Sequence, residues 1–254
     1  MSNIRTKSLL QLQRFGLISE IIPEQPETWL NRVFITLDVD WAPDFVVREV
    51  VESLELLGVP ATWFVTHASD ACKELEHRND SEVGAHPDFT RLLRPDRGDV
   101  SLESIISAMR DITPSATSFR CHALVQSSQI LAEMERAGFR HDCNVFLPFA
   151  PIDALEPWKH SALLTRIPYC WEDDTWLLGL CRAPQELVGG AGMKVIDVHP
   201  IHLWLNCETL ERYEHVKKSM NDESLLRASR NQSVKGVGDV FRETIEAIQA
   251  QDDQ

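Results

Sequence analysis

The sequence lacks long apolar runs, and its basic residues are outnumbered. No stretch approaches the roughly 18 apolar residues of a membrane span, and we see neither a signal peptide nor a membrane anchor. The 39 acidic and 25 basic residues are spread along the chain and give a formal net charge of -14. This balance argues against nucleic acid or an anionic membrane as a partner. We therefore expect a soluble protein of the cytoplasm.

Paired cysteines are also lacking. The six cysteines form no CxxC pair and follow no regular spacing, so neither a zinc knuckle nor a disulfide framework is indicated. Reduced thiols again fit the cytoplasm. The chain has 254 residues, 43% of them hydrophobic, which suffices for one barrel-sized domain or two small ones. The sequence gives no indication of the oligomeric state.

From Arg32 onward, short apolar runs alternate with helical patterns, which is typical of βα units and a parallel sheet. About six or seven strands favour a single α/β fold, an irregular (β/α) barrel, over two small domains. We assign residues 31–254 to this barrel and its C-terminal helices, and residues 1–30 to a helical extension and connector. The clearest expected strands are residues 32–38, 60–66, 81–86, 116–124, 161–171 and 193–204. The clearest expected helices are residues 44–58, 101–112, 127–138 and 239–250.

Polar residues fall at or near the ends of these strands. In a parallel barrel, the carboxyl ends of the strands meet on one face, where active sites are built. Residues two apart on a strand share a face, so Asp38 and Asp40 are expected to point the same way, as are Arg120 and His122. The residues concerned are Asp38, Asp40, His86, Arg120, His122, Asp197 and His199.

Two close carboxylates and nearby histidines suit a hydrolytic metal centre. A divalent metal on one carboxylate would leave the other free to take a proton, and histidine serves as a metal ligand or as an acid near neutral pH. Other roles are open: Asp40 and His86 could be turn residues, and His202 could be a ligand, a donor to a ligand or a packing residue. Trp41 and Trp171 could form the floor of a sugar site.

Five segments in this order resemble the polysaccharide deacetylase superfamily, that is, carbohydrate esterase family 4 and its relatives. They are "TLDVDWAPD", "EVGAHPDF", "SFRCHALVQS", "IPYCWEDD" and "IDVHPIHLW", and the resemblance covers residues 32–204. It implies an irregular (β/α) barrel that binds a divalent metal, usually zinc. It also implies removal of N- or O-acetyl groups from sugars by metal-activated water.

The resemblance also implies roles for individual residues. Asp38 would be the general base, and Asp40 and His86 would be metal ligands. Arg120 would orient Asp38, with Asp173 or Asp174 of "WEDD" behind it. His199 would protonate the leaving amine.

One position departs from the family pattern. A second metal histidine usually follows the first by four residues, but Thr90 stands there. His122 is our candidate for the missing ligand, and His202 is the other. We thus predict a zinc-type centre on Asp40, His86 and His122, with Asp38, Arg120, His199 and Asp174 in catalysis.

The predicted reaction is removal of an acetyl or formyl group from an amino sugar, a nucleotide sugar or a polysaccharide precursor. Two alternatives stay open. The chain could be a non-catalytic sugar-binding module on a degenerate deacetylase scaffold, or it could hydrolyse a small amide that is not a sugar.

Overall fold

The computed structural model describes residues 14–251, apart from residues 95, 97, 181–183 and 188. The strands described are β1 (Phe15–Gly16), β2 (Val33–Asp38), β3 (Ala61–Val65), β4 (Ser81–Ala85), β5 (Ser118–Phe119), β6 (His141–Phe146), β7 (Trp158–Lys159), β8 (Thr165–Tyr169), β9 (Trp171–Glu172) and β10 (Lys194–Val198). The helices described are α2 (Asp44–Leu57), α3 (Asp70–Leu75), α4 (Leu102–Ile112), α5 (Ser128–Arg136), α6 (Asp173–Leu177), α7 (Pro200–Leu205), α8 (Leu210–Val216), α9 (Glu223–Ala228) and α10 (Val237–Gln251).

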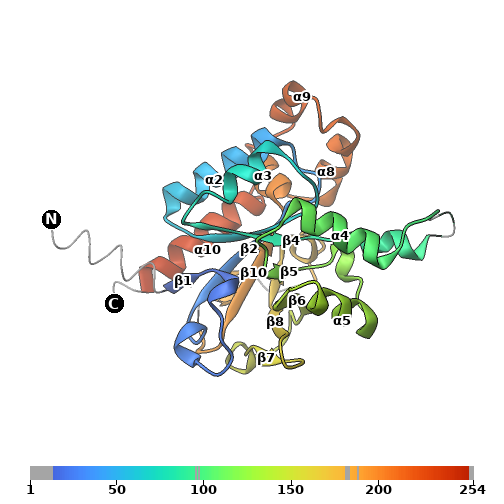
Figure 1. Ribbon diagram of the computed structural model, residues 1–254. Helices are drawn as coiled ribbons and strands as arrows, with labels where there is room; N and C mark the ends of the chain where they lie inside the picture. Colours follow the sequence, from blue (N-terminus) through green and yellow to red (C-terminus); the bar gives the residue numbers. More distant parts are fainter. Residues whose placement is uncertain (1–13, 95, 97, 181–183, 188, 252–254) are drawn as a thin grey trace.

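The strands form one sheet in the order β7-β8-β6-β5-β4-β3-β2-β10-β9, and β1 pairs with β2 (Figure 1). The described pairings are parallel except for β7 with β8. Only Cys170 separates β8, which pairs with β6, from β9, which pairs with β10. One segment, residues 165–172, therefore takes part at both ends of the strand order. This pattern matches the expected single α/β domain with an irregular barrel-like sheet.

Side-chain alternation along the strands divides the molecule into an interior and an outer layer. In β2, Ile35 and Leu37 pack with the helices, whereas Phe34, Thr36 and Asp38 point to the opposite face. The side chains that share the face of Phe34 on other strands include Phe64, Cys143, Ile167, Tyr169 and Val195. The strand sequence thus changes from apolar to acidic along its inner face, ending at Asp38.

Gly84 shows how tightly this interior is filled. A Cβ atom at this position would lie 2.6 Å from the ring of Phe64 and 2.7 Å from Oγ of Ser118. Because such contacts are too close for any side chain, glycine is needed in β4 for Phe64 to occupy the interior.

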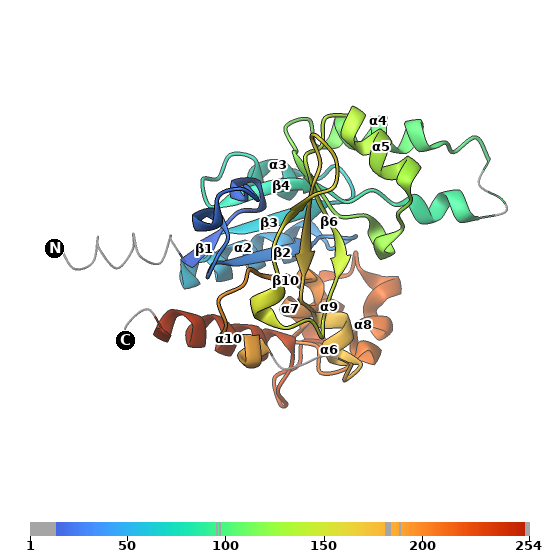
Figure 2. The same ribbon diagram turned by 90° about the horizontal axis from the view of Figure 1, so that it is seen from below.

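The helices cover the outer face of the sheet. Helix α2 packs on α3 and α7, and α7 packs on α10, while α4 and α5 pack together farther along the sheet (Figures 1 and 2). Helix α2 ends at Gly58, which has a φ of 67° and serves as the expected C-cap. Ser127 caps the start of α5 through the N–H of Ile130. No helix among the described residues combines the length and the apolar character needed to cross a bilayer.

The connector before β2 lies at the amino ends of the strands. Ile18 and Ile21 pack with the interior residue Phe34, and the N–H of Ile18 donates to Oγ1 of Thr62 at the start of β3. The sequence predicts a helix in this segment with Leu9, Leu10, Leu12 and Leu17 as its apolar positions. The first three lie outside the described residues, and Leu17 has an extended backbone instead of a helical one. The described part of residues 14–30 contains β1 and two short 3₁₀ helices, η1 (Ile18–Glu20) and η2 (Pro26–Thr28).

Three expected strands are shorter than the sequence pattern indicates. The expected strand at residues 161–171 begins only at Thr165, as β8, and is interrupted at Cys170 before β9. In residues 116–124, β5 ends at Phe119 and a 3₁₀ turn, η4, covers His122–Leu124, where Ala123 and Leu124 have positive φ. In residues 193–204, the strand ends at Val198 and α7 begins at Pro200. Proline at the first helical position explains the third change, because it favours a helix start and cannot donate to a sheet.

Candidate active site

A tight turn after β2 carries Asp40 over the carboxyl ends of the strands. The N–H of Ala42 donates to the carbonyl of Val39 over 3.0 Å, and Asp40 has a φ of 48°, an uncommon value for a residue other than glycine. The Asp40 carbonyl accepts a hydrogen bond from the hydroxyl of Thr66 and lies 3.1 Å from Nδ1 of His67. These contacts from the end of β3 hold the turn in place.

Three imidazole rings surround the carboxylate of Asp40. Its Oδ1 lies 3.0 Å from Nδ1 of His122 and 3.3 Å from Nε2 of His86. Its Oδ2 lies 3.8 Å from Nε2 of His199. Four residues that are up to 159 positions apart in the sequence thus meet around one carboxylate, as the strand-end pattern predicts.

The ionised form of Asp40 is strongly favoured. Burial by itself would raise the pKa of this carboxyl, but hydrogen bonds with His122 and His86 and the charge of His199 outweigh burial, so the pKa lies far below its usual value. The hydrogen bond with Asp40 in turn raises the pKa of His122. Asp40 is therefore a carboxylate under all physiological conditions.

The donor set of Asp40, His86 and His122 fits a divalent metal. One carboxylate oxygen and two imidazole nitrogens suit zinc and similar ions, and the three ligand atoms lie within 4.8 Å of one another. Donors about 2.1 Å from a tetrahedral ion lie roughly 3.4 Å apart, close to the 3.0 Å and 3.3 Å separations here. Nδ1 of His86 is buried without a hydrogen bond and faces Oδ1 of Asp38 at 3.7 Å. The Asp38 carboxylate therefore adjoins the His86 nitrogen that would not bind the metal.

Arg120 joins Asp38 to the interior of the sheet. Its Nη1 donates to Oδ1 of Asp38 over 2.9 Å and also to Asp197. Its Nε donates to the Cys143 carbonyl over 3.1 Å, and its Nη2 donates to Oγ1 of Thr36 over 3.0 Å. The prediction that Arg120 contacts Asp38 is thus met by the geometry. The prediction that Asp173 or Asp174 supports Arg120 is wrong, because the second carboxylate at Arg120 is that of Asp197 in β10.

The Arg120 guanidinium stays charged although it is fully buried. Burial lowers its pKa, but the charges of Asp197 and Asp38 outweigh this effect and raise the pKa above its usual value. The guanidinium also lies over two aromatic rings, 4.7 Å from the centroid of Phe64 and 4.5 Å from that of Tyr169. Phe64 of β3 and Tyr169 of β8 thus hold the guanidinium of Arg120, which in turn holds Asp38.

Asp173 instead holds His199. Its Oδ1 lies 2.8 Å from Nδ1 of His199, and its Oδ2 accepts from the backbone N–H of His199 over 2.8 Å. Burial lowers the pKa of His199, but the charge and hydrogen bond of Asp173, together with the charges of Asp174 and Asp40, outweigh burial and raise this pKa well above its ordinary value. The protonated form of His199, whose Nε2 faces Asp40 at 3.8 Å, is thus favoured by its surroundings.

His202 belongs to this second group and not to the ring of donors at Asp40. It lies on α7, with Nδ1 3.1 Å from Asp173 and 3.4 Å from Asp174. Asp174 contacts neither Asp38 nor Arg120. It therefore does not lie behind Arg120, where the sequence prediction placed it. Asp174 instead contacts His202, and its charge helps to raise the pKa of His199.

Three residues gain a place that sequence reasoning did not give them. Asp197 was noted as a strand-end residue without a role, although a charge between Ile196 and Val198 in a buried strand is itself a signal for a buried partner. Asp173 is fully buried, whereas the side chain of its neighbour Asp174 is 45% exposed. The sequence "EDD" does not reveal this difference. His67 lies in a polar stretch of the sequence, which gives it no role, but its Nδ1 contacts the Asp40 carbonyl.

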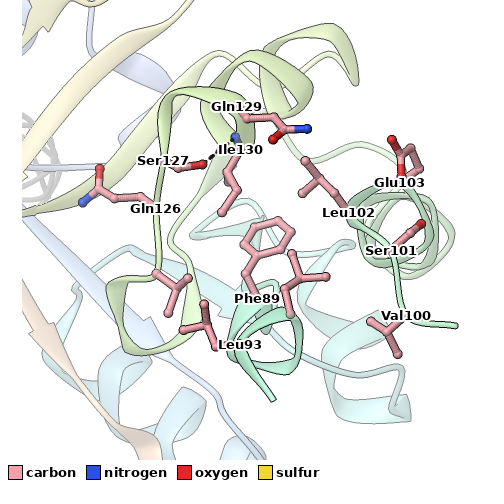
Figure 3. Close-up of a pocket in the computed structure, with 12 residues that line it drawn as sticks. Phe89, Leu93, Val100, Ser101, Leu102, Glu103, Gln126, Ser127, Gln129 and Ile130 are labelled. Carbon is pink, nitrogen blue, oxygen red and sulfur yellow. Dashed lines mark hydrogen bonds between the residues drawn. The ribbon is translucent and has the colours of Figure 1, made fainter. Parts of the chain in front are cut away.

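The described part of the structure contains a cavity of about 450 Å³. Figure 3 shows Phe89 at its centre, with Leu102 and Ile130 pointing inward and Gln126 and Gln129 at the rim. The segments that line it follow His86 and His122 by a few residues, but neither histidine lines it. The cavity is therefore not the space around Asp40.

His122→Ala is expected to remove most of the bound metal if His122 is the third ligand. Dialysed protein is measured by elemental mass spectrometry beside His202→Ala, which changes a histidine outside the Asp40 group that is more deeply buried, 3% exposed against 25% for His122. We expect a clear loss of metal in the first variant and wild-type stoichiometry in the second. The reverse result would move the assignment to His202.

The comparisons with known proteins agree with this geometry. The family model described as "WbmS-like: Polysaccharide deacetylase" matches residues 35–217, a range that contains every site residue named above. The crystal structure of WbmS from Bordetella bronchiseptica is 32% identical, with a TM-score of 0.82 over 94% of this chain and 98% of that chain. Its description assigns it to the polysaccharide deacetylases and to O-antigen biosynthesis. The comparison with curated protein sequences gave no match.

Two further solved structures are more distant. A Mycobacterium smegmatis protein, also assigned to the polysaccharide deacetylases, is 15% identical, with a TM-score of 0.48 over 86% of this chain and 90% of that chain. A family 4 carbohydrate esterase from Streptomyces lividans, solved with acetate, is 14% identical, with a TM-score of 0.41 over 66% of this chain and 78% of that chain. These likenesses are too weak to carry an argument about function.

Proposed function

Because the chain belongs to the WbmS-like family of polysaccharide deacetylases, which are hydrolases of sugar amide bonds, we propose that it removes an N-acetyl or N-formyl group from an amino sugar with the help of a divalent metal. The proposed acceptor is a nucleotide sugar or a precursor of a polysaccharide. The description of the B. bronchiseptica relative, which places that protein in O-antigen biosynthesis, supports such a precursor. A cytoplasmic location stays a prediction.

One observation carries the proposal. Asp40 is ringed by three imidazoles, and Asp38, held by Arg120, lies beside the same group through its contact with His86. These contacts at one end of the sheet support a ligand set with a separate carboxylate beside it. A sugar-binding module would not need a buried arginine to fix a carboxylate next to a set of metal donors.

Asp40, His86 and His122 would hold the cation, for which zinc is the ion we propose. When bound, it supplies Lewis-acid polarisation of the acyl carbonyl and acidifies water. The side chains around the cation would carry out the proton transfers, and the reacting atom of each can be named.

Asp38 is the proposed general base. Its Oδ1 is occupied by Arg120, and no hydrogen bond from a described residue reaches its Oδ2, which is thus available for a proton from the attacking water. As the new C–O bond forms, Asp38 takes that proton. Arg120 keeps the carboxylate oriented and ionised until then.

His199 is the proposed acid. When the C–N bond breaks, Nε2 of His199 gives its proton to the amide nitrogen, and Asp173 stabilises the charged imidazole beforehand. The products are a free amine on the sugar and acetate or formate. Return of the proton from Asp38 to His199 through solvent restores the starting state.

The test combines metal content with a substrate panel. We expect about one divalent ion per chain, retained in His160→Ala, whose side chain is exposed beside β7, and lost in His86→Ala. The panel contains N-acetyl and N-formyl amino sugars, their nucleotide-linked forms, short N-acetylated oligosaccharides and small amides that are not sugars. Release of amine and acid from the sugars, abolished by chelation and restored by zinc, supports the proposal.

Other outcomes contradict it. Turnover of the small amides alone would establish the amidohydrolase alternative. Sugar binding without metal or turnover, even after reconstitution, would establish the binding module.

A further inference from the structure

Trp41 is a large apolar side chain that remains exposed at the mouth of the site. It follows Asp40 directly and has 53% of its surface exposed, whereas its neighbours Asp40 and Ala42 are largely buried. Its ring meets that of His122 edge-on, with centroids 5.1 Å apart and an interplanar angle of 76°. One edge of the indole therefore adjoins a proposed metal ligand while much of its surface faces solvent.

The exposure of Trp41 is built into the backbone. The turn closes with the hydrogen bond from Ala42 to Val39, and both of these residues are buried, at 3% and 1% exposure. The positive φ of Asp40 and the contacts of its carbonyl with Thr66 and His67 fix the residue that precedes Trp41. The indole is thus presented at a set place, which is the preorganisation that a binding group needs.

A rigid, solvent-exposed indole beside a hydrolytic centre suits one kind of ligand. The faces of a pyranose ring carry C–H groups, and these pack on the face of an aromatic ring while the sugar hydroxyls stay in water. Trp171, the other tryptophan that the sequence suggested for a sugar floor, is fully buried and cannot serve.

We propose that Trp41 is the platform on which the pyranose ring of the substrate packs, so that the enzyme recognises the sugar and not only its acyl group. This inference rests on the proposed function, because it takes the substrate to be an N-acyl sugar. It makes Trp41 a determinant of specificity that contacts substrate beyond the reacting bond. Removing the indole should therefore weaken sugar binding more than it affects an acyl compound without a sugar.

The first test compares two substrates. For Trp41→Ala, the ratio of kcat/KM for an N-acetyl amino sugar to kcat/KM for para-nitrophenyl acetate is expected to fall about tenfold or more, mainly through KM for the sugar. Trp41→Tyr should recover much of the loss because it restores an aromatic face. Trp158→Phe is the matched control, because Trp158 is 37% exposed but lies on β7, at the amino end of β8. Metal content is measured in each variant.

The second test measures sugar binding in the absence of turnover. Titration of the metal-loaded protein with glucosamine is expected to change tryptophan fluorescence in the wild type and in Trp158→Phe, and not in Trp41→Phe. An unchanged ratio in Trp41→Ala, in an enzyme that does hydrolyse the sugar, would overturn the platform. An equal fall for both substrates, with loss of metal, would show that Trp41 only supports His122.

The proposed function can fail separately. If the wild type hydrolyses no sugar amide, that proposal is wrong, and the fluorescence titration still decides whether Trp41 binds a sugar. A fluorescence change that persists in Trp41→Phe would contradict the platform even if deacetylation is observed.

Discussion

Replacing Asp38 by asparagine is expected to lower kcat by about 10²–10⁴-fold while the protein stays folded and keeps its metal. The asparagine side chain has the same shape, and its amide oxygen can still accept from Nη1 of Arg120. Asp197 remains as a charge partner for the guanidinium. The amide, however, cannot take a proton from water. The loss should therefore appear in turnover and not in stability.

Steady-state kinetics, circular dichroism and metal analysis check this result. Asp70→Asn is the matched control, because it removes the same charge from a side chain that is 78% exposed at the start of α3. We expect the control to behave as the wild type. Activity of Asp38→Asn within a few-fold of the wild type would exclude Asp38 as the base.

Asp173→Asn is expected to lower kcat/KM by about 10²–10³-fold near neutral pH. Asp173 raises the pKa of His199, which keeps Nε2 protonated to higher pH than an ordinary histidine allows. Without the charge of Asp173, burial lowers that pKa against the charges of Asp174 and Asp40 alone. The acid form of His199 then disappears at lower pH, so the alkaline limb of the pH profile should move toward lower pH.

The profile of kcat/KM against pH is measured for Asp173→Asn and for Asp174→Asn. Asp174 is the residue that the sequence pattern placed in catalysis, and its side chain is 45% exposed and contacts His202 rather than His199. We expect a much smaller loss in the second variant and little movement of the alkaline limb. Equal effects in the two variants would mean that Asp173 does not act specifically through His199.

Much of this arrangement follows from local sequence patterns. Strand alternation and strand-end placement are local properties, and they suffice to predict that Asp38, Asp40, His86 and Arg120 share one face. His122 reaches that face even though β5 is short, because the N–H groups of Arg120 and His122 bond to the carbonyls of Ala85 and Pro87 and keep the chain extended. The predicted direction of these side chains therefore did not depend on the length of the strand.

Partner choice inside the site is not a local property. Whether Arg120 pairs with Asp173 or Asp197 depends on which strands lie opposite each other across the interior, and no pattern within one segment contains this information. Asp173 and Asp174 differ only in the direction that the start of α6 gives them, one inward to His199 and one toward solvent. The roles predicted for Asp38, Asp40, His86, His122 and His199 stay predictions until the variants are measured.

The triad of Arg120, Asp38 and Asp197 also constrains how the chain acquires activity. Its two carboxylates are 82 residues before and 77 residues after the arginine, so any piece of chain that contains the triad must run from Asp38 to Asp197. Contacts of such long range form only after costly loop closure and slow the folding of a domain. During synthesis, the triad can therefore form only after β10 has left the ribosome and joined β2. The contacts that hold Asp38 in its orientation are complete only once this late strand pairing has formed.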